Sequence, residues 1–234
     1  MGSSSRDREV DVGGTQRWHT RDVLQRSLKV RGCVACAAVN WFEWKSIHSF
    51  LYEGMMFPDV RDRFLRSGGF CLRHFTIAAQ IEIESWRAGG VGMAILCQDL
   101  INGERKLLRR ENTVNNKKAE IEGLPGANCM FCCEKADKER ILLEVLEEVR
   151  DEEPFRRAIE GQALCIRHAR IALSLWSNFA ARQWLVVQVE KKIEAADGDL
   201  GEFIRKHDYR YRDEDSARDR TVIDKARELI LGNN

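Results

Sequence analysis

The sequence has few prolines, no long apolar run and almost no net charge. Only 3 of its 234 residues are proline, and no segment alternates between apolar and polar residues, so the pattern favours helices over strands. The longest apolar runs, such as residues 184–187, are far shorter than the ~20 residues needed to span a bilayer. We therefore expect a compact, soluble, all-α protein without a membrane-spanning segment.

The balance of charges and the N-terminus exclude further classes of protein. Lys and Arg total 38 and Asp and Glu total 37, which gives a formal net charge of +1. No overall field therefore attracts nucleic acid or an anionic membrane. Because the N-terminus also lacks the apolar core of a secretory signal, we expect a cytoplasmic protein that binds neither nucleic acid nor membranes.

Common catalytic signatures are missing as well. The sequence contains no glycine-rich phosphate loop, no nucleophilic serine motif and no carboxylate pair with a spacing suited to acid–base catalysis. These absences favour a binding or structural role over an enzymatic one.

What the sequence does contain is eight cysteines, six of which occur with histidine in two similar sets. Each set reads Cys-x2-Cys followed by Cys-x2-His, and the two sets are Cys33, Cys36, Cys71 and His74, and Cys129, Cys132, Cys165 and His168. Three thiolates and one imidazole complete a tetrahedral shell. We predict that each set binds one metal and that the sets reflect an internal duplication.

Two metal chemistries fit these ligand sets. Zinc favours tetrahedral shells of sulfur and nitrogen, and four protein ligands leave no position for a reactive water. We therefore expect two structural Zn²⁺ ions per chain. The alternative is a pair of [4Fe–4S] clusters, which are also held by cysteine-rich sets. Two Cys-x2-Cys redox motifs are a further alternative, although no βαβ pattern accompanies them.

Three residues beside the ligands have more than one possible role. Arg73 and Arg167 occupy the same place in the two Cys-x2-His pairs. A zinc centre with three thiolates and one imidazole has a net charge of −1, so each arginine could donate to a sulfur, or else face solvent. Cys133 directly follows Cys132 and is either a substitute ligand or a bystander at the start of a helix.

Helical stretches and chain breakers divide the sequence into five segments. The predicted segments are a disordered tail rich in Ser, Gly and charge (1–20), a first helical metal-binding repeat (21–88), a connecting helix and linker (89–126), a second metal-binding repeat (127–197) and a C-terminal helical extension (198–234). Within the second repeat we expect one long helix from Cys165 to about Ala196. The prediction is thus two pseudo-repeated helical halves, each clamped by a Cys3His metal site.

The order of these motifs resembles the bacterial family called domain of unknown function 6062. The resemblance rests on the two ligand sets and on the basic segment at residues 203–210, and it covers about residues 20–231. It implies a helical, prokaryotic, cytosolic protein with paired metal sites, and it implies no activity. The second set has residues Gln-Ala-Leu at 162–164 where the first has Gly-Gly-Phe at 68–70, which argues against a shared loop conformation.

These features predict a two-site zinc protein that acts as a structural scaffold or as an adaptor for one or more protein partners. One alternative is an iron–sulfur protein that transfers electrons or senses oxidation. Another is an accessory subunit of a larger enzyme complex. Metal content separates the first two functions, and co-purification with other subunits identifies the third.

Overall fold

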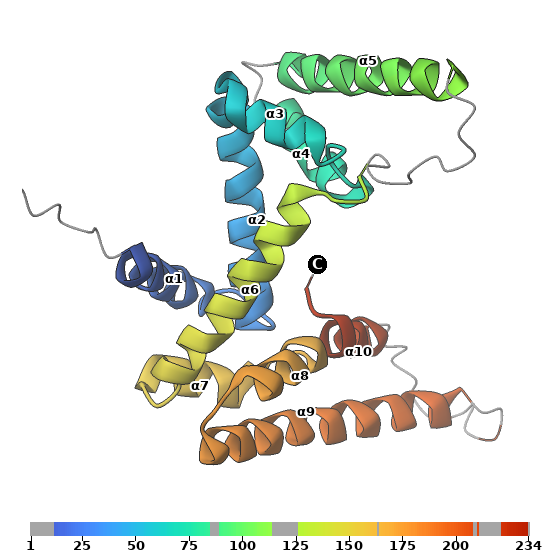
Figure 1. The fold of residues 1–234 in the computed structure, drawn as a ribbon. Helices are drawn as coiled ribbons and strands as arrows, with labels where there is room; N and C mark the ends of the chain where they lie inside the picture. Colours follow the sequence, from blue (N-terminus) through green and yellow to red (C-terminus); the bar gives the residue numbers. More distant parts are fainter. Residues whose placement is uncertain are drawn as a thin grey trace, which may run out of the picture. The chain divides into compact units, whose positions relative to one another are not determined.

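The computed structural model describes residues 12–84, 89–113, 126–162, 164–207, 210 and 221–233. Every regular element in this part of the chain is a helix (Figure 1). The all-α fold class predicted from the sequence is confirmed. No helix among the described residues is both long enough and apolar enough to cross a membrane.

The helices are numbered along the chain. They are α1 (Val12–Ser27), α2 (Val34–Tyr52), the short 3-10 helix η1 (Gly54–Met56), α3 (Pro58–Arg66), α4 (Leu72–Glu84), α5 (Val91–Thr113), α6 (Met130–Val149), α7 (Glu153–Gln162), α8 (Ile166–Leu175), α9 (Phe179–Lys206) and α10 (Thr221–Leu231).

The chain divides into two compact units. Unit 1 comprises Met1–Asn40 and Glu139–Asn234, and unit 2 comprises Trp41–Lys138. Unit 2 is therefore an insertion in the sequence of unit 1, and α2 and α6 each contribute residues to both units. This division differs from the predicted one, which placed two metal-binding repeats in consecutive segments at 21–88 and 127–197.

Unit 2 is built around four phenylalanines. The ring centroids of Phe50 and Phe64 are 4.9 Å apart, those of Phe64 and Phe70 are 4.8 Å apart, and those of Phe70 and Phe131 are 5.2 Å apart. These rings come from α2, α3, the turn before α4, and α6, so they join elements that are distant in sequence. Because Phe70 directly precedes Cys71, the aromatic core also positions a predicted metal ligand.

Unit 1 contains a helix break that the sequence did not reveal. The backbone of Trp176 is extended, with φ −67° and ψ 129°, and its buried indole Nε1 donates to the carbonyl of Leu143 over 2.9 Å. Asn178 then caps α9 by accepting from the N–H of Ala181 over 3.0 Å. The single helix predicted from Cys165 to Ala196 is therefore wrong, since α8 and α9 are separate.

The N-terminal region of unit 1 is helical over part of the predicted tail. α1 begins at Val12, whereas disorder was expected through residue 20. Leu24 is fully buried, and Arg21 forms an ion pair of 2.7 Å with Glu152. These contacts give the helix packing partners that its local composition does not reveal. The tail at residues 1–11, the linker at 114–125 and residues 211–220 of the predicted extension lie outside the described residues.

The segment between α3 and Cys71 differs in length and conformation from the segment between α7 and Cys165. Gly68 and Gly69 both have φ of 78°, in the region that glycine enters without strain. In unit 1 α7 continues through Gln162, and Ala163 lies outside the described residues.

Phe64→Ala should lower the free energy of unfolding by about 3–5 kcal/mol, because Phe64 is fully buried and its truncation leaves a cavity. Denaturant unfolding measures the change. The matched control is Phe57→Ala, since 60% of Phe57 is exposed and its loss should cost less than about 0.5 kcal/mol. Equal losses in the two variants would contradict the assigned core.

Candidate metal centres

The eight predicted ligands lie in two sites, but the pairs combine differently from the sequence prediction. Site A comprises Cys33, Cys36, Cys165 and His168. Site B comprises Cys71, His74, Cys129 and Cys132. Within each site the ligand atoms lie within 4.8 Å of one another. The expectation that each Cys-x2-Cys pair joins the next Cys-x2-His pair along the chain is therefore wrong.

The continuity of α2 explains this correction. Cys33 stands at the start of α2, but His74 contacts the same helix at Glu43, where His74 Nε2 and Glu43 Oε1 are 3.0 Å apart. Nearly three turns of helix separate Cys33 from Glu43. The imidazole of His74 therefore lies out of reach of the thiol of Cys33, and the ligands from the start of α6 take that place.

Each pair of ligands stands at a helix N-terminus. The helices α2, α4, α6 and α8 begin one residue after Cys33, Cys71, Cys129 and Cys165. Backbone N–H groups at this position have no partner within the helix and favour thiolates. At Cys129 burial opposes ionisation, but His74 and the backbone N–H groups of Cys71, Cys132 and Phe131 lower the pKa of the thiol to about 6.

The distances in site A suit a single tetrahedral ion. The Sγ atoms of Cys36 and Cys165 are 3.7 Å apart. His168 Nδ1 lies 3.6 Å from Cys33 Sγ, 3.3 Å from Cys36 Sγ and 3.1 Å from Cys165 Sγ. Around one ion with Zn–S bonds of ~2.3 Å and a Zn–N bond of ~2.0 Å, tetrahedral geometry places the ligand atoms ~3.5–3.8 Å apart. The donor set therefore fits zinc in both composition and spacing.

Site B has nearly the same dimensions. The Sγ atoms of Cys71 and Cys132 are 3.6 Å apart, and His74 Nδ1 lies 3.0–3.4 Å from the three sulfurs. A disulfide would require ~2.05 Å between two sulfurs, and all eight cysteines are free. Cys133 is exposed and is not among the ligands of site B, so Cys132 fills the fourth position.

A buried carboxylate contacts the outer nitrogen of each imidazole, and sequence reasoning missed both residues. Glu43 of α2 lies 3.0 Å from His74 Nε2, and Glu139 of α6 lies 2.7 Å from His168 Nε2. In both histidines Nδ1 faces the sulfurs, which leaves Nε2–H to face the carboxylate. A carboxylate at this place fixes the orientation of a metal-binding histidine and raises its basicity.

The sequence did carry a signal for these two carboxylates. Glu43 follows Cys33 by the same ten residues that separate Glu139 from Cys129. Both glutamates are buried on helices whose other buried residues are mostly apolar. A comparison of the two sets beyond their Cys and His residues would have identified them.

Arg73 and Arg167 pair with these carboxylates, and among the described residues neither donates to a sulfur. Arg73 donates to both oxygens of Glu43, over 2.8 and 2.6 Å, and Arg167 donates to Glu139 over 2.8 Å. Lys135 lies 3.2 Å from Glu43 as a further cation. Burial opposes ionisation of Glu43, but Arg73, His74 and Lys135 together outweigh it and hold the pKa of the carboxyl well below its ordinary value. The arginines thus reach the metal ligands indirectly, through Glu and His.

The two sites differ in their exposure to solvent. All four ligands of site A are buried, whereas in site B Cys132 is exposed and Cys71 is half-buried. Competing metal ions and thiol-reactive reagents can therefore reach the ligands of site B more easily than those of site A.

The chain after α10 covers site A. Gly232 has φ of +84°, and a Cβ at this position would lie 2.4 Å from Cys36 Sγ, so only glycine fits against the sulfur. The following residue is held in place because Asn40 Nδ2 donates to the carbonyl of Asn233 over 2.7 Å, and Asn233 Nδ2 donates to the carbonyl of Arg31 over 3.0 Å.

Comparison with known proteins gives a family and one curated relative. The chain is 27% identical over 180 residues to an uncharacterized 23.9 kDa protein in the xynA 3′ region of Caldicellulosiruptor sp. (strain Rt8B.4), and the alignment covers 76% of this chain and 83% of that protein. No solved structure matches the chain. A family of unknown function, DUF6062, matches residues 20–234. Because that match spans nearly the whole chain, the protein belongs to the DUF6062 family.

Proposed function

We propose that each site binds one zinc ion with a structural role, and that the protein is a helical scaffold that acts as an adaptor for a protein partner. The observation that carries the proposal is the spacing of the ligand atoms, which suits one tetrahedral ion per site. Three thiolates and one imidazole fill all four positions, so no position is left for a water or a substrate. Such an ion holds helix starts together.

The same spacing supports zinc over a [4Fe–4S] cluster. In a four-iron cluster each ligand binds a different iron and points away from the centre, so the ligand atoms lie further apart than around a single ion. Ligand atoms within 4.8 Å of one another leave too little space for a four-iron core.

Zinc binding would outweigh the entropy lost in closing long loops. Site A joins residues up to 135 positions apart and includes a loop about twice as long as that of site B, which joins residues up to 61 positions apart. A doubling of loop length costs only about 0.6 kcal/mol. The apparent binding free energy of structural zinc is about 10–16 kcal/mol, so the sequence distance between ligands is a minor obstacle.

Zinc content should reveal the pairing of the ligands. The wild-type protein should hold about two zinc ions per chain, and Cys36→Ser combined with Cys165→Ser should leave about one, because both substitutions fall in site A. Cys36→Ser combined with Cys71→Ser removes one ligand from each site and should weaken both. Zinc remaining after dialysis against a chelator is the measurement.

Cys133→Ser is the control for this experiment, because Cys133 is not a ligand in site B, and it should retain the wild-type zinc content. If the Cys36 and Cys71 double variant kept one tightly bound zinc while the Cys36 and Cys165 variant kept none, the crossed pairing would be refuted. Iron with acid-labile sulfide in the wild-type protein would overturn the zinc assignment itself.

Glu43→Gln should weaken zinc binding at site B by about 10–100-fold, because the substitution removes the charge that supports the ligand His74 while keeping its shape. Competition with a chromophoric chelator measures the affinity of each site. Glu53→Gln is the control, since Glu53 lies just after the same helix and is exposed. An unchanged affinity at site B would show that the carboxylate does not support the ligand.

The adaptor role is supported by an exposed apolar groove on α8 and α9. The groove is lined in part by Leu173, Phe179, Trp184 and Val187. Of these side chains, Phe179 is 69% exposed and Val187 is 45% exposed. Contiguous exposed aromatic and aliphatic side chains are typical of surfaces that bind other proteins.

A photo-crosslinking residue in place of Val187 should capture a defined protein partner in cells, because Val187 lies in the apolar groove. Mass spectrometry identifies the partner. The control position is Asp197, which is exposed on the same helix and is not among the residues that line the groove. Phe179→Asp should abolish the crosslink from position 187. Equal capture from both positions, or from neither, would contradict the adaptor role.

A further inference from the structure

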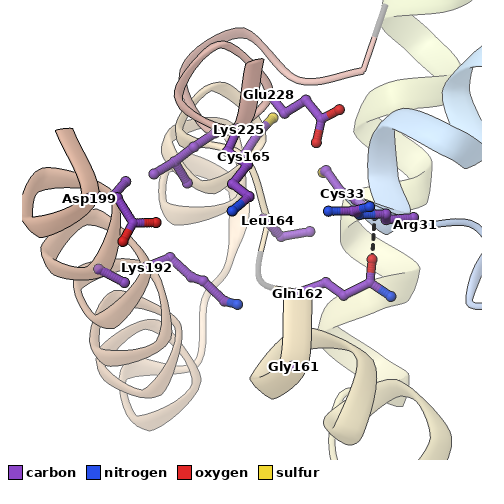
Figure 2. A pocket seen from close by; sticks show the side chains of 14 residues that line it. Arg31, Cys33, Gly161, Gln162, Leu164, Cys165, Lys192, Asp199, Lys225 and Glu228 are labelled. Carbon is purple, nitrogen blue, oxygen red and sulfur yellow. Dashed lines mark hydrogen bonds between the residues drawn. The ribbon is translucent and has the colours of Figure 1, made fainter. Parts of the chain in front are cut away.

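A pocket in unit 1 is surrounded by charged side chains from separate segments. It has a volume of about 360 Å³, within the range of small-molecule sites. Its walls come from the turn before α2, the end of α7, α9 and α10 (Figure 2). Three cations, Arg31, Lys192 and Lys225, and two carboxylates, Asp199 and Glu228, line it.

Small side chains on α9 leave the space open. Lys192, Ala195, Ala196 and Asp199 all line the pocket, and their spacing of three, four and seven residues places them on one helix face. The two alanines therefore lie between the two charged residues along this face. Figure 2 shows Lys192 extending from α9 toward the side of the pocket formed by Gly161 and Gln162.

Among the described residues, none of the five charged side chains that line the pocket takes part in an ion pair. Three cations against two carboxylates give these five side chains a net charge of +1. Cations that gather around a hollow without internal partners are suited to bind an anion, because arginine and lysine form strong charge-assisted hydrogen bonds with anionic oxygens.

The pocket adjoins site A without entering its coordination shell. Cys33 and Cys165 belong to the pocket wall, but both are buried and are held in site A. A molecule in the pocket would therefore cover the outer side of site A and contact the cations instead of the metal. Its binding does not depend on which metal site A holds.

We propose that this pocket binds a small molecule that carries an anionic oxygen group, a phosphate or a carboxylate, together with hydroxyl or amino groups. Arg31, Lys192 and Lys225 hold the anionic oxygens. Asp199 and Glu228 accept hydrogen bonds from the hydroxyl or amino groups of the same molecule. The mixed lining thus selects against simple inorganic anions and against purely apolar compounds.

Isothermal titration calorimetry of the metal-loaded full chain tests this proposal. Ribose 5-phosphate is the phosphate-bearing probe and citrate is the carboxylate-bearing probe, so the two arms distinguish the sources of the anion. We expect saturable binding of at least one probe. Lys192→Ala should weaken it about tenfold, the effect of losing one charge-assisted hydrogen bond.

Two further variants separate the pocket from general surface charge. Lys191→Ala removes a neighbouring lysine that is outside the pocket lining and should leave the affinity unchanged. Ala196→Phe fills the hollow without changing any charge and should abolish binding, with circular dichroism confirming that the variant is folded. The proposal is overturned if neither probe binds or if Lys192→Ala and Lys191→Ala bind equally well. None of these outcomes bears on the zinc assignment, because the zinc content of the protein tests that assignment separately.

Discussion

Two four-ligand sites bring the start of one long helix together with a Cys-x2-His pair elsewhere in the chain. α2 supplies Cys36 to site A and Glu43 to site B, whereas α6 supplies Cys132 to site B and Glu139 to site A. Each helix thus provides thiolates to one site and the carboxylate that orients the histidine of the other. Both helices therefore contribute residues to both sites.

The ligands were predictable from the sequence, but their pairing was not. Cys-x2-Cys and Cys-x2-His are local patterns, and their chemistry alone indicates a metal. Which pairs meet depends on tertiary structure. The observed loop from Cys36 to Cys165 spans 129 positions, nearly four times the distance from Cys36 to Cys71. The longer loop costs only about 1.2 kcal/mol more in loop-closure entropy. Sequence distance is therefore a minor factor, and the continuity of α2 past Glu43 determines which pairs meet.

Other differences between expectation and structure have the same origin in long-range contacts. The break between α8 and α9 depends on the hydrogen bond from Trp176 to Leu143, 33 residues earlier. α1 forms although its sequence is rich in polar residues, because Leu24 finds a buried place in unit 1. Composition and periodicity record the helical tendency of a segment, but they do not record the partners that end a helix or extend it.

Along the sequence, all ligands of site B lie between the first and last ligands of site A. This order has a consequence during protein synthesis. Cys36 leaves the ribosome roughly 6–26 s before Cys165, at a rate of about 5–20 residues per second, and Cys71 and His74 are the first complementary pair to follow it. Helix formation takes only about a microsecond. Once α2 has formed, its length separates the first thiolates from this early, incorrect pair. The length of one helix therefore opposes the incorrect pairing, and site B can close before Cys165 and His168, the last ligands of site A, are synthesised.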